Sequence, residues 1–366
     1  MNKREGRSLS WATALLLALA VCAAGFVLAR LLVRPARTAL DDVTLLPCTS
    51  SQSIEILNQG IVYSDGASLR ALNGNGRLIW SYVIGANCSF SVGGSNVAGW
   101  SNDLLVVLNG SSGDVQFSAS LGETVLSAVT GEVYTAALLG EEGKASLVVL
   151  DKNGREVDRI AQADTTVLDY GFFNSGNMLY VLALDTNGTV PMSQITTYRP
   201  GRMQAGSITD SEQVIYKVML DANNVVAVGT TYIRVYDYTG SEVVSRRKLV
   251  YGWEMMDSEV RNADPLMAFA PMTEIGTTAE ISDVRMVNAN ADRTGRMPFV
   301  CFALAVHSDM VYGFNANYVM TYPVTSASAT AYHLPFECNG AVGVTSEGNV
   351  ILVSGDSVYL VKLPGS

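Results

Sequence analysis

Ser68-Leu69-Arg70-Ala71-Leu72-Asn73 is a short apolar run that ends at a turn residue, and seven variants of it follow along the chain. The later copies are LLVVLN ending at Asn109, SLVVLD at Asp151, QITTYR at Arg199, YIRVYD at Asp237, DVRMVN at Asn288, YVMTYP at Pro323 and VYLVKL reaching Pro364. Successive ends lie 35 to 51 residues apart, with a mean near 42. A repeat of this period with four strands per unit is typical of a propeller blade. The sequence therefore predicts an all-β, eight-bladed β-propeller, with seven blades as the alternative.

The composition agrees with many short strands joined by tight turns. Of 366 residues, 33 are Gly, 10 are Pro and only 16% are charged. Each unit should contain an inner strand, a second strand, the repeated segment as third strand, and an outer strand. In the first unit these are predicted at residues 54–57, 61–63, 69–72 and 78–82. The strands of the sixth unit, between Trp253 and Pro298, are the least clearly marked because Ala-, Asn- and Thr-rich insertions interrupt them.

The first unit also resembles a known repeat. Residues 71–80, ALNGNGRLIW, resemble the repeat of quinoprotein-type (PQQ-like) propellers, in which an Ala-x-Asp turn, a Gly and a Trp recur. The overall plan resembles an uncharacterised clostridial family of membrane-anchored propellers. The resemblance implies fold and location but no reaction, and no cofactor is expected because the repeat Trp girdles the fold rather than binding the quinone.

The N-terminal segment differs in composition from the rest of the chain. Residues 11–29 contain no charge, and the apolar sequence continues to Val33. At 1.5 Å per residue this segment is long enough to cross a bilayer. We predict a basic cytoplasmic tail (1–10), a transmembrane signal-anchor (11–33) and a linker (34–42) before the propeller (43–366). The alternatives are a signal peptide cleaved near Ala18-Leu19-Ala20 and a lipoprotein modified at Cys22.

The charge of the chain limits its partners. Residues 1–40 carry six basic residues and one acidic residue, which leaves 18 basic against 33 acidic in the rest. Such an acidic domain lacks the basic patch that nucleic acid requires, so no nucleic-acid partner is expected. Basic residues flank the span on both sides, but an export-type start favours a propeller outside the membrane. Anionic headgroups should repel the domain, so membrane contact is expected through residues 11–33 alone.

Ring closure should use the N-terminal side of the chain. The sequence stops soon after the eighth copy of the repeat, which leaves the last unit without an outer strand. Residues 43–46 are the only unassigned apolar run. We predict that they pair with residues 357–363, because an open ring would expose a strand edge.

Few residues indicate chemistry. The two histidines, His307 and His333, lie in different predicted strands, so no multi-His metal site is expected. Asp151-Lys152-Asn153-Gly154 and Asp185-Thr186-Asn187-Gly188 resemble the start of a calcium loop but lack its twelfth-position Glu. Both sites fit hairpin turns better.

Four cysteines outside the apolar segment, Cys48, Cys88, Cys301 and Cys338, fall at four consecutive unit junctions in the predicted ring. They are either independent buried thiols or disulfides between neighbouring junctions, with a shared metal site as a third reading. Cys301–Cys338 and Cys48–Cys88 are the expected pairs, and Cys48–Cys338 is the alternative.

Two classes of function remain. The favoured one is a binding or scaffolding module for a protein, peptide or glycan, tethered outside the membrane. The alternative is an extracytoplasmic lyase or hydrolase with an acidic site in the central channel. The inner strands read as mainly small, apolar and hydroxyl residues, for example residues 124–129 and 340–345, so an enzyme is not favoured.

Overall fold

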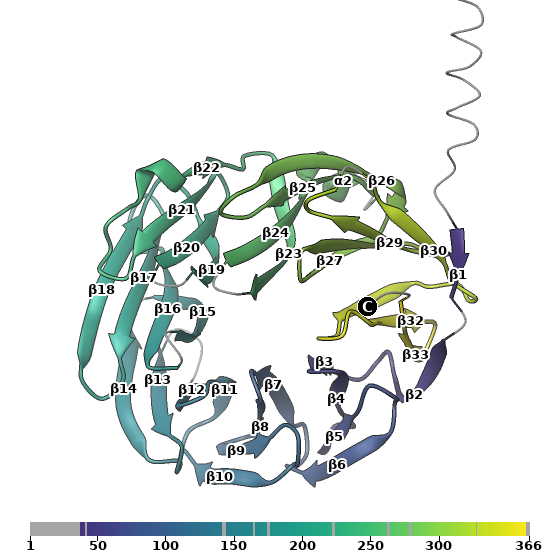
Figure 1. The fold of residues 1–366 in the computed structure, drawn as a ribbon. Coiled ribbons are helices and arrows are strands. Elements are labelled where there is room, and N and C mark those ends of the chain that lie inside the picture. The colour runs from purple at the N-terminus through teal and green to yellow at the C-terminus, as the bar shows by residue number, and fades with distance from the viewer. Residues whose placement is uncertain are drawn as a thin grey trace, which may run out of the picture.

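The fold is an eight-bladed β-propeller whose blades surround a central channel (Figure 1). In this computed structural model the described residues are 37–40, 42–140, 144–163, 165–173, 176–221, 224–261, 264–277, 280–326 and 328–363. Within them, eight sheets each supply one blade, so the alternative of seven blades is wrong.

Each blade runs from an inner strand beside the channel to an outer strand at the rim. The inner strands are β3 (Ile54–Leu57), β7 (Ser89–Gly93), β11 (Val125–Thr130), β15 (Thr166–Phe173), β19 (Ile215–Asp221), β23 (Trp253–Arg261), β27 (Ala303–His307) and β31 (Gly340–Val344). The second strands are β4 (Gly60–Ser64), β8 (Asn96–Ser101), β12 (Tyr134–Leu139), β16 (Met178–Asp185), β20 (Asn224–Gly229), β24 (Asp264–Pro271), β28 (Met310–Phe314) and β32 (Val350–Ser354).

The repeated segment forms the third strand of every blade, as predicted. The third strands are β5 (Ser68–Leu72), β9 (Leu104–Asn109), β13 (Lys144–Asp151), β17 (Met192–Arg199), β21 (Tyr232–Asp237), β25 (Ile281–Val287), β29 (Tyr318–Pro323) and β33 (Ser357–Val361). The outer strands are β6 (Leu78–Val83), β10 (Val115–Ser120), β14 (Glu156–Ala163), β18 (Met203–Asp210), β22 (Lys248–Leu249), β26 (Asp292–Cys301), β30 (Thr330–His333) and β2 (Val43–Thr49).

The ring closes through β2, which confirms the predicted exchange. β2 pairs antiparallel with β33, with Val43 opposite Val361 and Leu45 opposite Tyr359. Blade 8 therefore takes three strands from the end of the chain and one from its beginning. β2 lies beside the blade of β33 in Figure 1.

The start of the described chain differs from the predicted linker. Residues 37–39 form β1 (Arg37–Ala39), which pairs in parallel with β30 and gives blade 7 a fifth strand. The predicted span, 11–33, lies outside the described residues. Within the described ranges, no helix has the length and apolar character needed to cross a bilayer.

Blade 6 contains the insertions that interrupt the regular strand pattern of its sequence. β23 and β26 have 9 and 10 residues, and the short helix α2 (Met272–Thr277) lies between β24 and β25. A 3-10 turn, η1 (Val244–Arg246), similarly interrupts blade 5 before β22. These irregular connections replace tight turns, so the sequence loses its regular spacing there.

Apolar side chains fill every junction between blades. The cluster of blades 8 and 1, for example, combines Leu46 and Leu360 with Ile61 and Tyr63. At the rim, the Trp80 indole of blade 1 donates a hydrogen bond to Gly110 O of blade 2 at 2.7 Å. Gly113 has φ +75°, and an added Cβ there would lie 2.6 Å from the indole. Trp80 thus has the girdling role that the PQQ-like resemblance implied.

Candidate binding site

The two ends of the channel have different borders. Since strands alternate in direction within each blade, all inner strands end at one face, which we call the hairpin face. At the opposite face, called the crossover face, each outer strand passes to the inner strand of the next blade. Side chains at the ends of inner strands therefore gather at the hairpin face.

A cavity of about 790 Å³, called the funnel, opens where the inner strands of blades 2 to 6 end. Glycine and aromatic residues make up much of its wall. The Phe172 ring lies so close to Gly131 that an added Cβ there would be 3.0 Å from a ring carbon. The Tyr180 ring packs in the same way against Gly171, at 3.1 Å. Tyr180 and Gly171 are buried, whereas Phe172 and Gly131 are half-buried, so the latter pair supplies the ring and backbone that an extended chain or a sugar ring could contact.

Two charged groups of the funnel, Lys217 and Asp169, form an ion pair. Lys217 Nζ lies 3.5 Å from Asp169 Oδ2, and the Tyr180 hydroxyl donates to the same oxygen at 3.2 Å. Burial, with Asp169 nearby, raises the pKa of Tyr180. Burial also raises the pKa of Tyr170 to about 12, and its hydroxyl lies 2.8 Å from Ser127 Oγ. These tyrosines stay neutral at ordinary pH and act as hydrogen-bonding groups.

Further carboxylates lie on the inner strands, contrary to the reading of these strands as mainly small, apolar and hydroxyl residues. Glu55 Oε2 accepts the amide hydrogen of Val92 at 2.7 Å. Asp257 Oδ2 accepts that of Val306, also at 2.7 Å. In both cases the carboxylate of one blade holds the inner strand of the next, and burial raises the pKa of the carboxyl.

The histidines are not brought together. His307 ends β27, and its Nδ1 lies 3.1 Å from Glu259 Oε1 of blade 6. His307 also lines a second cavity of about 740 Å³ at blades 7 and 8, beside Glu347 and Lys362. His333 lies in the outer strand β30, where its ring meets Tyr318 edge-on at 5.2 Å.

In the two calcium-like turns, the Asp carboxylate oxygens accept hydrogen bonds from backbone amides of the same turn. Asp151 Oδ1 accepts the amide hydrogens of Asn153 and Arg155 at 2.8 and 3.0 Å. These hydrogen bonds, led by that of Arg155, lower the pKa of Asp151. Asp185 Oδ1 accepts the Asn187 amide at 2.9 Å. Over the described part of the chain, no three His, Cys, Asp or Glu residues are grouped so that they could hold a metal ion.

The four cysteines lie at the predicted junctions as free, buried thiols. Each belongs to a different core cluster, between blades 8 and 1 (Cys48), 1 and 2 (Cys88), 6 and 7 (Cys301), and 7 and 8 (Cys338). Burial raises the pKa of Cys48 to about 11 and that of Cys301 to about 12. Of the sequence-based alternatives, the structure has the independent buried thiols, and mass spectrometry tests the disulfide alternative.

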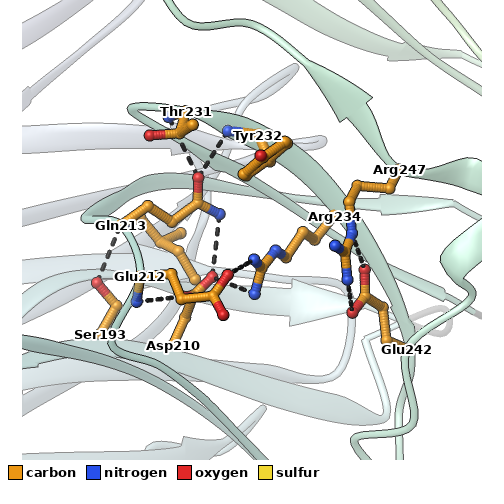
Figure 2. A network of polar contacts seen from close by, with 10 residues as sticks. Ser193, Asp210, Glu212, Gln213, Thr231, Tyr232, Arg234, Glu242 and Arg247 are labelled. Atoms are coloured by element: carbon orange, nitrogen blue, oxygen red, sulfur yellow. Dashed lines mark hydrogen bonds and ion pairs between the residues drawn. The ribbon is translucent and has the colours of Figure 1, made fainter.

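A polar network that sequence reasoning missed joins blades 4 and 5 at the crossover between β18 and β19 (Figure 2). Gln213 Oε1 accepts the backbone amides of Thr231 and Tyr232 at 3.2 and 2.7 Å. Its Nε2 donates to Asp210 Oδ2 at 3.0 Å. The crossover is thereby fixed to the turn between β20 and β21.

Arg234 anchors the same network from the middle of β21. It pairs with Asp210 at 3.2 Å and with Glu212, while Arg247 and Glu242 form a separate bidentate pair. The Arg234 side chain is only 9% exposed and that of Asp210 is fully buried. The partners lie 22 to 24 residues apart in sequence, so no local motif marks them. We interpret this network as a brace between blades.

Comparison with known proteins supports the fold alone. No protein-family model matches the chain, and no curated protein sequence is significantly similar to it. Among solved structures, the chain is similar to BamB from Moraxella catarrhalis, a PQQ-like propeller, with 12% identity and a TM-score of 0.53 over 89% of this chain and 99% of that one.

WD40 propellers are similar as well. The C-terminal WD40 domain of Sif2 shares 10% identity, with a TM-score of 0.63 over 90% of this chain and all of that one. Sqt1 from Saccharomyces cerevisiae shares 10% identity, with a TM-score of 0.59 over 90% and 100%. The resemblance to the clostridial family stays a prediction.

Proposed function

We propose that this chain is a binding or scaffolding module, tethered to the membrane by residues 11–33, whose propeller holds a segment of a protein, peptide or glycan partner outside the cytoplasm. The observation that supports this proposal is the funnel. Its volume of about 790 Å³ lies within the range of roughly 300–1,000 Å³ that is usual for ligand pockets. That is enough for a few residues of peptide or a short oligosaccharide.

The lining of the funnel suits recognition of a chain-like ligand. The half-buried Phe172 ring lies in the funnel wall, and the half-buried Gly131 beside it has no side chain to cover its backbone. Tyr180 and Gly171 are buried and form the floor behind them. Lys217 has a side chain that is 42% exposed, so it can contact a ligand while remaining near Asp169. The funnel wall mixes apolar and polar groups, and placed polar groups fix the orientation of a ligand in a binding pocket.

The proposed location rests on the sequence. The uncharged residues 11–29 and the export-type start favour an inserted anchor, and the acidic propeller would then lie outside. An external protease added to intact producing cells should digest the propeller if this is correct. Protection until the membrane is broken would place it inside.

Site-specific photo-crosslinking tests the funnel. A photoreactive amino acid replaces Glu132, an exposed residue of the funnel wall, or Met203 on the rim as the matched control. We expect the probe at Glu132 to give discrete protein adducts or, on an oligosaccharide array, glycan adducts that the probe at Met203 does not give. A Lys217→Met substitution should weaken them. Identical adducts from both positions, or none from Glu132 on either platform, would count against the funnel.

A further inference from the structure

Three consecutive outer strands carry no charged residue. These are β2 (VTLLPCT), β6 (LIWSYV) and β10 (VQFSAS), from blades 8, 1 and 2. Their exposed apolar residues form what we call the apolar rim: Leu45 (61% exposed), Leu78 (58%), Ile79 (47%), Val83 (72%) and Val115 (44%). By contrast, β14 contains Glu156, Asp158 and Arg159, and β26 contains Asp292, Arg293 and Arg296.

The three strands form a continuous surface because each packs on the next blade. Leu46 of β2 contacts the turn of blade 1, where an added Cβ on Gly76 would lie 2.9 Å from it, and Leu78 follows two residues later. Trp80 of β6 contacts the turn of blade 2 at Gly113, and Val115 again follows two residues later. The exposed apolar positions therefore step from one blade to the next along the rim.

The chain joins the ring beside this surface. β1 lies on blade 7 and β2 completes blade 8, directly before the uncharged strands of blades 1 and 2. Only residues 34–36 separate the apolar segment 11–33 from β1 at Arg37. Four peptide steps from Val33 to Arg37 reach at most about 14 Å. The headgroup layer alone is roughly 5–8 Å thick, so a bilayer anchor would hold the edge of blades 7 and 8 at the membrane surface.

The distribution of charge favours one side of blades 7 and 8 as the part of the propeller edge that faces the lipid. On one side of blades 7 and 8 lies blade 6, whose outer strand exposes Asp292 and Arg296; on the other side lies the apolar rim. Burying ions in an interface costs more than burying Leu or Val, which is favourable. The expected repulsion came from the net charge of the whole propeller. The three outer strands of this sector carry no charge themselves, and the exposed Asp42, Arg77 and Asp114 lie in the connections that precede them.

We propose that the apolar rim rests in the headgroup region of the lipid bilayer, so that the propeller stands edge-on with both ends of its channel open sideways. This inference rests on the membrane anchor of the proposed function. The lipid contact itself is new, because it assigns a second membrane-binding element to the propeller. It also leaves the funnel accessible to a partner that approaches along the membrane.

The test uses the full chain in phosphatidylcholine vesicles, some of whose lipids carry a nitroxide quencher near the headgroup. An environment-sensitive fluorescent amino acid replaces Val83 or, as control, Met203. The two residues are matched, since both lie in outer strands and are 72% and 71% exposed, but they belong to blades 1 and 4. We expect quenching at least threefold stronger at position 83 than at position 203.

Alkaline extraction of the same vesicles separates the two claims. Chain that stays in the membrane supports the anchor, and chain that is released overturns both the anchor and the rim contact. Equal quenching at the two positions in membrane-retained chain overturns the rim contact alone. A third outcome would be a blue shift of the emission at position 83 that grows with the protein-to-lipid ratio and is unaffected by the nitroxide quencher. It would show that a second copy of the chain covers the apolar rim, which also overturns the proposal.

Discussion

Replacing Leu46 with Ala tests the closure of the ring, because Leu46 lies in the strand that completes blade 8 from the other end of the chain. Its side chain is 3% exposed and belongs to the cluster that joins blade 8 to blade 1. The substitution leaves a cavity between the first and last blades without changing the hydrogen bonds of β2.

The expected effect follows from its burial. Truncating a buried Leu to Ala costs roughly 2–5 kcal/mol, and a value of about 3 kcal/mol suits a site at a packed junction. A domain of about 320 residues has an unfolding entropy of roughly 0.7 kcal/mol per degree, so Tm should fall by about 4 °C. Deleting residues 41–48 removes most of the strand and should lower Tm much further.

Thermal unfolding of the full chain in detergent, followed by near-ultraviolet circular dichroism, measures the effect. Leu45→Ala is the matched control, since Leu45 lies next in the same strand but is 61% exposed. Its Tm should change by about 1 °C or less, as for most surface substitutions. Equal shifts for the two variants, or a shift of about 1 °C or less for Leu46→Ala, would refute the closure model.

Four further predictions follow from the packing and charges. Gly113→Ala should lower Tm more than Gly94→Ala, because both glycines have positive φ but only at Gly113 would the new Cβ meet a side chain, the indole at 2.6 Å. Arg234→Met should cost about 3–5 kcal/mol in unfolding free energy, measured by urea titration, since it leaves a buried carboxylate unpaired. Because burial raises the folded pKa of Asp257, the wild type should lose stability as pH rises from the ordinary Asp pKa through the raised one, and Asp257→Asn should remove this pH dependence in urea titrations. At low pH the variant should be the less stable chain, because its single amide oxygen replaces two carboxylate oxygens that accept the amides of Ser258 and Val306. Under non-reducing conditions, mass spectrometry should find the four buried cysteines alkylated only in denaturant, and a disulfide between any two would contradict the free thiols.

The sequence predicted the third strand of every blade, because each repeat presents the same apolar run before a turn. Leu104–Asn109 and Tyr232–Asp237 are almost wholly buried strands that end where Asn or Asp begins a hairpin. It also predicted the closure through residues 43–46, which lie in β2, since a ring leaves only one place for an unassigned apolar run. The third strands are local features, and the closure follows from assigning every apolar run to a strand, so both can be predicted from the order of residues along the chain.

The site was less predictable. Asp169, Lys217 and Tyr180 lie up to 48 residues apart, and only the ring brings them to one funnel. The inner-strand carboxylates were visible as residues, but their role depends on the amide of the next blade, as for Glu55 and Val92. The brace of Arg234 and Asp210 had no sequence signal for the same reason.

By itself, then, the sequence determined the propeller class, the strand order and the N-to-C closure, because hydrophobic period and turn chemistry repeat within each unit. It favoured eight blades over seven, and the eight sheets of the structure decided between them. Tertiary structure alone decided which charges meet, which glycines lie against rings, and which outer strands lie side by side to form an apolar rim. Those contacts join different blades across the curvature of the ring. The angle between adjacent blades, and not the spacing of residues along the chain, therefore determines which residues meet at these contacts.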